Sequence, residues 1–495
     1  MAAWSLKSGD VGQAIAMAGA IVAAVFAVAL VWRKPDIVVY GVFLAAVTIE
    51  TGSLGSGLSL TDKLPAFQNL QTLLPLPGLI LNPVEAMALL SIGVLLVKTR
   101  VHPETRVLLG PLWLPFALLM GVVLLGVFRG VQGGGDIRIA LWGVRAMILM
   151  FIAYVLTVSL VRRPEQLRIL FLLLVAGVTI KGLVGLWRFV VDFGGQISVE
   201  VDTGLPGNSL MAHEESFFFL VAAFMAVLAV VYGLPKRDRQ LSLMAFVITV
   251  LPLLANQRRV AIAAFVIAAV LLLIVLYALE PRRRRSIVSL LMLCALILPV
   301  YGFATWNSDT LIAMPAQAIK SQFAPDRRDA SSDKYRDIEN VNLRATAQES
   351  PLLGIGFGLP MTQEQILPNI SRSYDWYLYL PHNNLLWLAM TTGMLGLCVF
   401  GWLIASVLVQ TVAAVKASAT EPRFRALFVL SLLTTAMFLT FALYDQGLLS
   451  QRICLFMGVQ FGLLALAPRL SAEVAQPAFS LWQLSKERID ADIRA

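Results

Sequence analysis

The chain has 495 residues, of which 58% are hydrophobic and 14% are charged, and its mean hydropathy is +0.78. A soluble chain carries about 25% charged and about 45–50% apolar residues, so this composition excludes a soluble multidomain enzyme and a disordered chain. Apolar segments recur from one end to the other. They predict an all-α, polytopic transmembrane bundle, and the net charge of +9 indicates membrane orientation rather than nucleic-acid binding.

A membrane span needs about 20 apolar residues. We expect about 12–13 spans, arranged as an N-terminal transmembrane bundle over 1–305, a large and partly helical outer loop over 306–383, C-terminal transmembrane helices over 384–467 and a cytoplasmic tail over 468–495. The thirteen candidate segments are 11–32, 37–50, 78–97, 107–128, 140–161, 167–191, 213–233, 240–256, 260–279, 286–305, 384–414, 424–444 and 449–467.

Lysine and arginine gather at every second connection, which marks those connections as cytoplasmic. The opposite connections are longer and acidic or neutral, so function is expected at the outer face. With thirteen spans the N-terminus lies outside. The basic connections carry Arg33 and Lys34; Lys98, Arg100 and Arg106; Arg162, Arg163 and Arg168; Lys236, Arg237 and Arg239; Arg282 to Arg285; and Lys416, Arg423 and Arg425.

The three cysteines, Cys294, Cys398 and Cys454, lie inside apolar segments. Neither their spacing nor their neighbours suit a disulfide framework or a zinc site, so no metal is expected.

Ionisable side chains inside spans are costly, and they mark function or buried pairing. Glu85 and Arg145 are interpreted as a structural ion pair between two helices. Arg188 lies near the outer end of its span, where it either reaches the interface or contacts a substrate. Lys181 either binds phosphates or balances nearby acids.

Arg258 and Arg259 lie between two apolar segments at the outer face, where positive charge is disfavoured. Planar guanidinium groups bind phosphate oxygens in a bidentate way, so this pair suits an anionic ligand. The alternative is contact with anionic lipid headgroups.

The outer loop 306–383 has mixed charge. Residues 326–339 predict a solvated helix or turn, and 342–347 predict a short helix that Glu349-Ser350-Pro351 stops. The run 354–358, Gly-Ile-Gly-Phe-Gly, lacks the context of a dinucleotide fold or a P-loop, and it predicts a tight turn.

Pro381-His382-Asn383-Asn384 starts the next span at the outer surface. A neutral imidazole at His382 could accept a proton from a hydroxyl near pH 7. The alternative is a histidine that only caps a helix.

These segments together resemble the O-antigen ligase and polymerase superfamily over roughly residues 110–465. In that family an arginine-containing segment, here with Arg344, precedes a Pro-x-x-Gly-x-Gly-x-Gly turn and a His-Asn helix start in the large periplasmic loop. Arg258-Arg259-Val260-Ala261 is similar to the family's Ser-Arg-Gly-Ala element, which aligns Arg259 with its arginine. Residues 204–208 resemble a further family loop more weakly.

The resemblance implies an inverting glycosyltransferase of the bacterial inner membrane with its active site at the periplasmic face. The family transfers a glycan from a polyprenyl (undecaprenyl) diphosphate to an acceptor hydroxyl, without a nucleotide, metal or other cofactor. His382 and Arg344 would be catalytic. The diphosphate or substrate contacts would be Arg259, Arg258, Arg188 and Asn383.

Within this resemblance we expect a ligase, which would use a glycolipid acceptor such as lipid A–core, or a protein. Three other assignments remain open. A polymerase of the superfamily would join carrier-linked repeat units. A flippase or other transporter would carry polar residues through its spans and some repeat symmetry. A peptidoglycan polymerase of the shape-and-division family would need a catalytic acid in an outer loop.

Overall fold

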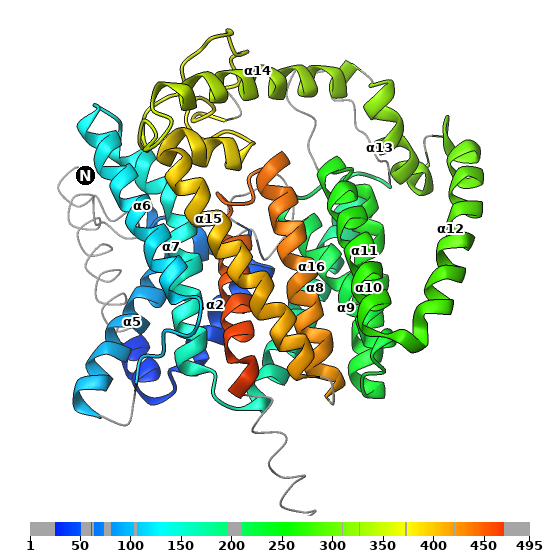
Figure 1. Cartoon of the computed structure of the whole chain (residues 1–495), viewed down its shortest axis with the longest axis horizontal. Helices are drawn as coiled ribbons and strands as arrows, with labels where there is room; N and C mark the ends of the chain where they lie inside the picture. The colour runs from blue at the N-terminus through cyan, green and yellow to red at the C-terminus, as the bar shows by residue number, and fades with distance from the viewer. Residues whose placement is uncertain are drawn as a thin grey trace, which may run out of the picture.

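The computed structural model of the chain describes residues 25–50, 61, 64–73, 81–102, 106–195, 210–308, 310–325, 327–371, 374–418 and 421–469, apart from the side chains of residues 327 and 328. Within these residues there are helices, turns and loops but no strand. Long helices stand side by side, and α14 (Arg327–Glu349) lies across one end of the bundle (Figure 1). The predicted all-α membrane fold is confirmed.

Ten helices in the described part are long and apolar enough to cross a membrane, and each overlaps a predicted span. They are α6 (Trp113–Gln132), α7 (Ile137–Leu160), α8 (Pro164–Trp187), α9 (His213–Val231), α10 (Lys236–Ala255), α11 (Arg259–Leu279), α12 (Arg284–Thr305), α15 (Asn384–Ala417), α16 (Pro422–Tyr444) and the last helix (Gln451–Arg469).

Two further predicted spans form helices, α5 (Pro83–Val101) and α2 (Asp36–Thr48), that are not among the ten helices long and apolar enough to cross a membrane. α5 begins with a capping box, because the Asn82 side chain accepts from the Glu85 N–H and the Glu85 carboxylate accepts from the Asn82 N–H, both at 2.8 Å. α2 has only 13 residues, which is too short to cross the hydrocarbon layer alone. Its last carbonyls therefore need partners inside the protein.

Aromatic packing fills the middle of the bundle. Phe217 and Phe218 of α9 lie edge-on to Phe456 of the last helix at 5.9 and 5.6 Å between ring centroids, and Phe43 of α2 stacks on Phe456 at 5.6 Å. These rings place α9 and the last helix at the centre of the bundle.

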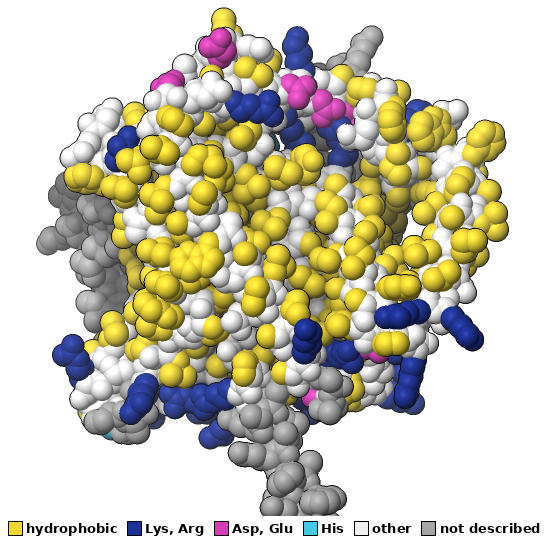
Figure 2. Space-filling model, in the orientation of Figure 1, with side chains coloured by type: hydrophobic (Ala, Val, Ile, Leu, Met, Phe, Trp, Pro, Cys, Tyr) yellow, Lys and Arg dark blue, Asp and Glu magenta, His cyan; other side chains and the backbone are white. Residues whose placement is uncertain are grey.

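α12 stands apart at the edge of the molecule. Of its side chains only Ile287 is buried, and Figure 2 shows its apolar side chains standing away from the body of the protein. Val270 and Ile274 of α11 are also exposed.

The two ends of the bundle differ in charge. We call the end covered by α14 the α14 face. On the face seen in Figure 2, lysine and arginine side chains line the opposite end, where the predicted cytoplasmic connections lie. The positive-inside rule favours a cytoplasmic position for that end, as the sequence predicts.

The long connection between α12 and α15 contains η4 (Leu311–Ala313), α13 (Met314–Phe323) and α14. The sequence predicted a solvated segment and a separate short helix, but the two form the single helix α14, which ends at Glu349 as expected. It is not free in solvent, because Tyr335, Glu339, Asn342 and Thr346 are buried at helical spacing along one face.

Candidate functional site

A pocket of about 740 Å³ opens at the α14 face between α11, α13, α14 and the start of α15. One part of its wall is apolar and comes mainly from α11 and α13, including Val260, Ala263, Ile267, Ile319 and Phe323. The other part is polar and consists of Arg259, Asp333, Arg336, Asp337, Glu339, Asn340, His382 and Asn383. The pocket therefore suits a ligand with an apolar tail and a charged head.

His382 is held at the polar end by Glu339 of α14. Its backbone N–H donates to Glu339 Oε2 at 3.0 Å, and its ring Nδ1 lies 3.2 Å from Glu339 Oε1. The Glu339 carboxylate is 1% exposed, and the Tyr335 ring meets the imidazole edge-on at 5.9 Å. A neutral imidazole that donates from Nδ1 keeps its lone pair on Nε2.

Asn383, rather than His382, caps the following helix. Its side-chain oxygen accepts from the Leu386 N–H at 3.1 Å, and its amide donates to Asn340 Oδ1 at 3.0 Å. Asn384 is buried and accepts from the Leu448 N–H at 2.8 Å. These bonds fix the backbone that carries His382.

Arg258 and Arg259 point in different directions. Arg259 lines the pocket and holds Asp333 through two hydrogen bonds of 3.0 and 2.6 Å. Arg258 is the N-cap residue of α11 and donates to the Met211 carbonyl at 3.5 Å. The structure therefore brings Arg259 together with His382, while Arg258 is not part of the pocket wall.

Arg344 lies on α14 but is exposed and does not line the pocket. About two turns earlier on the same helix, Arg336 does line it, beside Asn340 and His382. Sequence reasoning missed Arg336, because the segment around it was interpreted as a solvated helix or turn without a packed face. Recognising one continuous helix would have placed Asp333, Arg336 and Asn340 on one face.

Arg188 lies in a buried position away from the pocket wall. It begins the π-helical turn Arg188–Asp192 that continues α8, and it is 4% exposed. Its Nε lies 3.9 Å from Asp192 Oδ2. Among the described residues, Nε and Nη1 have no hydrogen-bond partner.

Asp445 follows α16 and is a buried acid that the sequence reasoning did not single out. Burial alone would raise its pKa, but the positive charges of Arg258 and Arg336, and of His213 and His382 when they are protonated, outweigh this effect and hold the pKa below its usual value. Asp445 thus connects Arg258 electrostatically with His382, although they come from different elements.

The predicted tight turn at 354–358 is present. Gly354, Gly356 and Gly358 all have positive φ, at 68°, 103° and 87°, which favours glycine. Residues 351–358 pack against α6 and against a break in α15 at Gly393, where φ is 66°.

This turn provides hydrogen-bond partners for backbone groups at the break in α15. The N–H groups of Ile355 and Gly356 donate to the carbonyls of Met390 and Thr391, at 2.8 and 3.1 Å, and the Met394 N–H donates to the Pro351 carbonyl at 2.8 Å. The turn therefore satisfies the backbone groups that the break leaves open and anchors the segment before His382.

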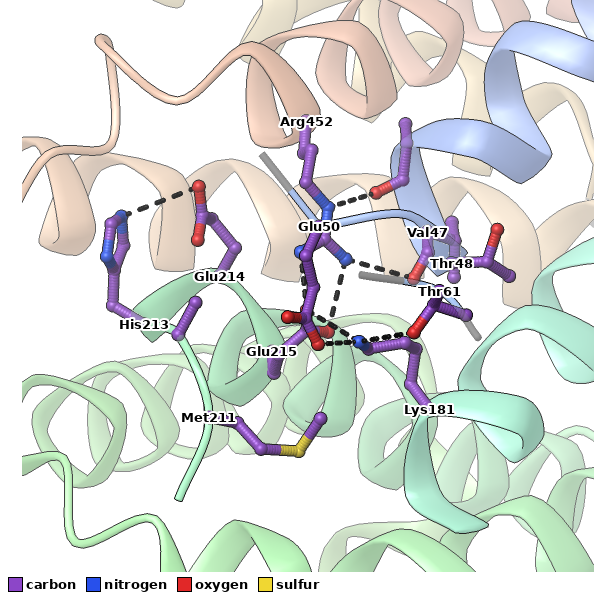
Figure 3. A network of polar contacts seen from close by, with 12 residues as sticks. Val47, Thr48, Glu50, Thr61, Lys181, Met211, His213, Glu214, Glu215 and Arg452 are labelled. Atoms are coloured by element: carbon purple, nitrogen blue, oxygen red, sulfur yellow. Dashed lines mark hydrogen bonds and ion pairs between the residues drawn. The ribbon is translucent and has the colours of Figure 1, made fainter. Parts of the chain in front are cut away.

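A separate cluster of charges lies inside the bundle (Figure 3). Lys181 of α8 pairs with Glu50 and lies 3.3 Å from Glu215 of α9. Arg452 of the last helix also pairs with Glu215, and it donates to the carbonyls of Ala46 and Val47 at 2.8 and 3.1 Å. Lys181 thus balances the charge of buried acids. Arg452 provides hydrogen-bond donors for the last carbonyls of the short helix α2.

Glu85 and Arg145 form the expected ion pair, with Nε 2.8 Å from the carboxylate. Arg452 is a pairing residue that sequence reasoning missed, although an arginine inside an apolar segment was the available signal. Residues 204–208 lie outside the described part of the chain. No group of three or more histidine, cysteine or acidic residues that could hold a metal occurs among the described residues.

Residues 244–401 match the family model described as O-antigen ligase. The match begins in α10 and ends in α15, so it includes Arg259, α14 and His382. It confirms the resemblance inferred from the motifs. No curated protein matches the chain.

Proposed function

We propose that this chain, a member of the O-antigen ligase and polymerase superfamily, transfers a glycan from a polyprenyl diphosphate to an acceptor hydroxyl. The acceptor favoured here is a glycolipid resembling lipid A–core, and the site faces the periplasm of the inner membrane. The observation that carries the proposal is the divided pocket, in which Arg259, Arg336 and His382 meet at the end of an apolar wall.

The donor has three chemically different parts that match three parts of this site. Its diphosphate would lie against Arg259 and Arg336, whose planar forks match phosphate oxygens. Its prenyl chain would follow the apolar face of α11, past Ile267 and toward the exposed Val270 and Ile274. The separation of α12 from the bundle leaves this route open to lipid. The glycan would extend outward beneath α14.

In the structure the guanidinium of Arg259 is hydrogen-bonded to the Asp333 carboxylate. Asp329 Oδ1 also lies 3.8 Å from Arg259 Nε. A carboxylate presents two oxygens to a guanidinium much as a phosphate does. The Asp333 side chain is 41% exposed, so its release to water costs little compared with that of a buried acid. We therefore interpret Asp333 as an anion that the donor displaces.

The transfer exchanges one C–O bond for another. The acceptor oxygen attacks the anomeric carbon, its proton passes to His382 Nε2, and the bond from the anomeric carbon to the diphosphate breaks. Negative charge moves onto the diphosphate, where Arg259 and Arg336 stabilise it. Attack opposite the leaving group inverts the anomeric centre.

Glu339 acts through His382. It fixes the ring orientation and stabilises the imidazolium that forms when Nε2 takes the proton. Asn383 keeps the same segment in place through Asn340. Arg344, Arg258 and Arg188 stand outside the pocket wall. The catalytic role of Arg344 and the diphosphate or substrate contacts of Arg258 and Arg188 stay predictions.

The test uses the purified full chain in detergent with a polyprenyl-diphosphate oligosaccharide, a core-lipid acceptor and EDTA. Wild type and His382→Ala are compared by product mass. Transfer of an intact glycan to the lipid, lost in His382→Ala, supports a metal-independent ligase. Lengthening of the carrier-linked chain instead supports the polymerase.

His102→Ala is the matched control, because it removes a histidine far from the pocket, after α5. It is expected to transfer at the wild-type rate. Transfer at the wild-type rate by His382→Ala would contradict the mechanism. Absence of any chemistry in folded wild type, with varied donors and added divalent metal, would favour a transporter.

A further inference from the structure

A second cavity, of about 290 Å³, lies in the half of the bundle away from α14. The first turns of α8 and α16, the last turns of α9 and part of the last helix form its wall. The lining is mostly apolar, with Leu167, Phe171, Leu174, Met225, Leu427 and Leu463 among its members. Its position beside the basic connections places it in the cytoplasmic leaflet.

Four charged residues stand at one end of this cavity: Arg168, Asp238, Glu421 and Arg423. Arg423 Nη2 lies 3.1 Å from Asp238 Oδ2. Arg168 is exposed, and it makes no hydrogen bond or ion pair within the described part of the chain. The rim therefore offers both positive and negative charge to one ligand.

Asp238 gives the most specific indication of that ligand. It is 3% exposed, and its Oδ1 atom is buried with no hydrogen-bond partner among the described residues. A buried carboxylate oxygen without a donor is costly and uncommon. A ligand that brings an N–H group to this position would remove the cost.

The apolar part of the cavity further restricts the class of ligand that fits. A cavity of this size lined by leucine and phenylalanine tends to stay dry, and at this depth the surrounding medium supplies acyl chains. The ligand needs an acyl chain, a phosphate for Arg168 and a hydrogen-bonding cation for Asp238 and Glu421.

We propose that this cavity binds a phospholipid with a primary ammonium headgroup, of the phosphatidylethanolamine class, from the cytoplasmic leaflet. One acyl chain fills the apolar cavity, the phosphate lies at Arg168, and the ammonium donates to Asp238 Oδ1. Phosphatidylcholine has no hydrogen-bond donor in its headgroup. The hydroxyls of phosphatidylglycerol can donate to Asp238 but carry no positive charge, so a primary ammonium suits the two acids best. The inference does not depend on the glycan transfer.

The first experiment measures lipid retention by native mass spectrometry of the delipidated full chain in detergent. Phosphatidylethanolamine is expected to be retained about tenfold better than phosphatidylcholine, the effect of one hydrogen bond to a charged group. Asp238→Asn should remove most of that preference. Arg237→Gln, an exposed neighbour outside the cavity lining, should leave it unchanged.

The second experiment needs no variant, and so it stays informative if Asp238→Asn fails to fold. A phosphatidylethanolamine with a diazirine in its acyl chain is photolysed with the wild-type chain, and the labelled peptides are mapped. Labelling concentrated in 167–174 and 424–430 supports the site. Equal retention of the two lipids, labelling concentrated on α11 and α12, or preferential retention of a prenyl lipid would overturn it.

Discussion

At the scale of single residues, the pocket distinguishes arginines that the sequence motif treats alike. Arg336 lines the pocket, whereas Arg344 is exposed two turns further along α14. Loss of a preorganised charge that stabilises a leaving group lowers kcat by about 10²–10³. We expect that loss for Arg336→Ala and less than about tenfold for Arg344→Ala.

Single-turnover rates of glycan transfer, measured on protein of matched monodispersity, check this pair of variants. The motif assigns the catalytic role to Arg344 and the geometry assigns it to Arg336. A larger loss for Arg344→Ala would show that α14 presents a different face when the donor is bound.

Substitution of Asp333 is expected to strengthen donor binding, in contrast to the loss of activity expected for Arg336→Ala. Because the Asp333 carboxylate is hydrogen-bonded to Arg259 at 2.6 Å, Asp333→Asn should free the guanidinium and lower KM for the donor, with kcat little changed. Asp337→Asn is the matched control, since Asp337 lines the same pocket while Arg259 pairs with Asp333 and Asp329. A higher KM for Asp333→Asn would mean that Asp333 positions Arg259 rather than competing for it.

Their positions beside spans at the outer face made Arg259 and His382 candidates, and the resemblance to the superfamily's motifs assigned them to the site. The sequence could not assign Glu339, whose role depends on a contact with His382 across 43 residues of chain. Nor could it separate Arg258 from Arg259, since only the fold brings Asp333 to Arg259 and the Met211 carbonyl to Arg258.

At the scale of elements, the glycine turn and the broken helix α15 form one unit. A Cβ atom on Gly356 would lie 2.2 Å from the Gly130 backbone nitrogen of α6, and its φ of 103° is unfavourable for other residues. Gly356→Ala should therefore lower both the melting temperature and the transfer rate, because the segment leading to His382 loses its anchor.

Gly134→Ala provides the comparison. Gly134 also has positive φ, at 86°, but a Cβ there would meet nothing within 4 Å. Thermal unfolding of both variants in detergent separates backbone strain from the clash. Equal melting temperatures for the two variants would show that the turn does not depend on its close approach to α6.

The spans were predictable because their apolar runs are long and the basic connections alternate. The shape of the outer segment was not, because α14 carries a buried stripe that includes Glu339 and Asn342. Polar residues of this kind give no hydrophobic period, so a packed helix resembled a solvated one. The break at Gly393 was hidden for a related reason, since its partners are backbone atoms of a distant turn.

At the scale of the whole molecule, the charge asymmetry predicts the sidedness of the pocket. In a variant whose three cysteines are replaced, Ala330→Cys on α14 should react with a membrane-impermeant maleimide in spheroplasts. Arg285→Cys, in the first turn of α12 at the basic end of the bundle, should react only after the membrane is broken. The reverse pattern would place the pocket in the cytoplasm and would contradict the proposed donor.

The isolation of α12 has a consequence for how fast such a protein works. If the donor arrives through the side of the bundle, both its approach and the departure of the spent carrier are diffusion in two dimensions. The encounter rate then depends on the number of carriers per unit area of bilayer and on bilayer viscosity. Turnover would slow sharply when the surrounding lipid passes into a gel phase, even with every residue of the pocket in place.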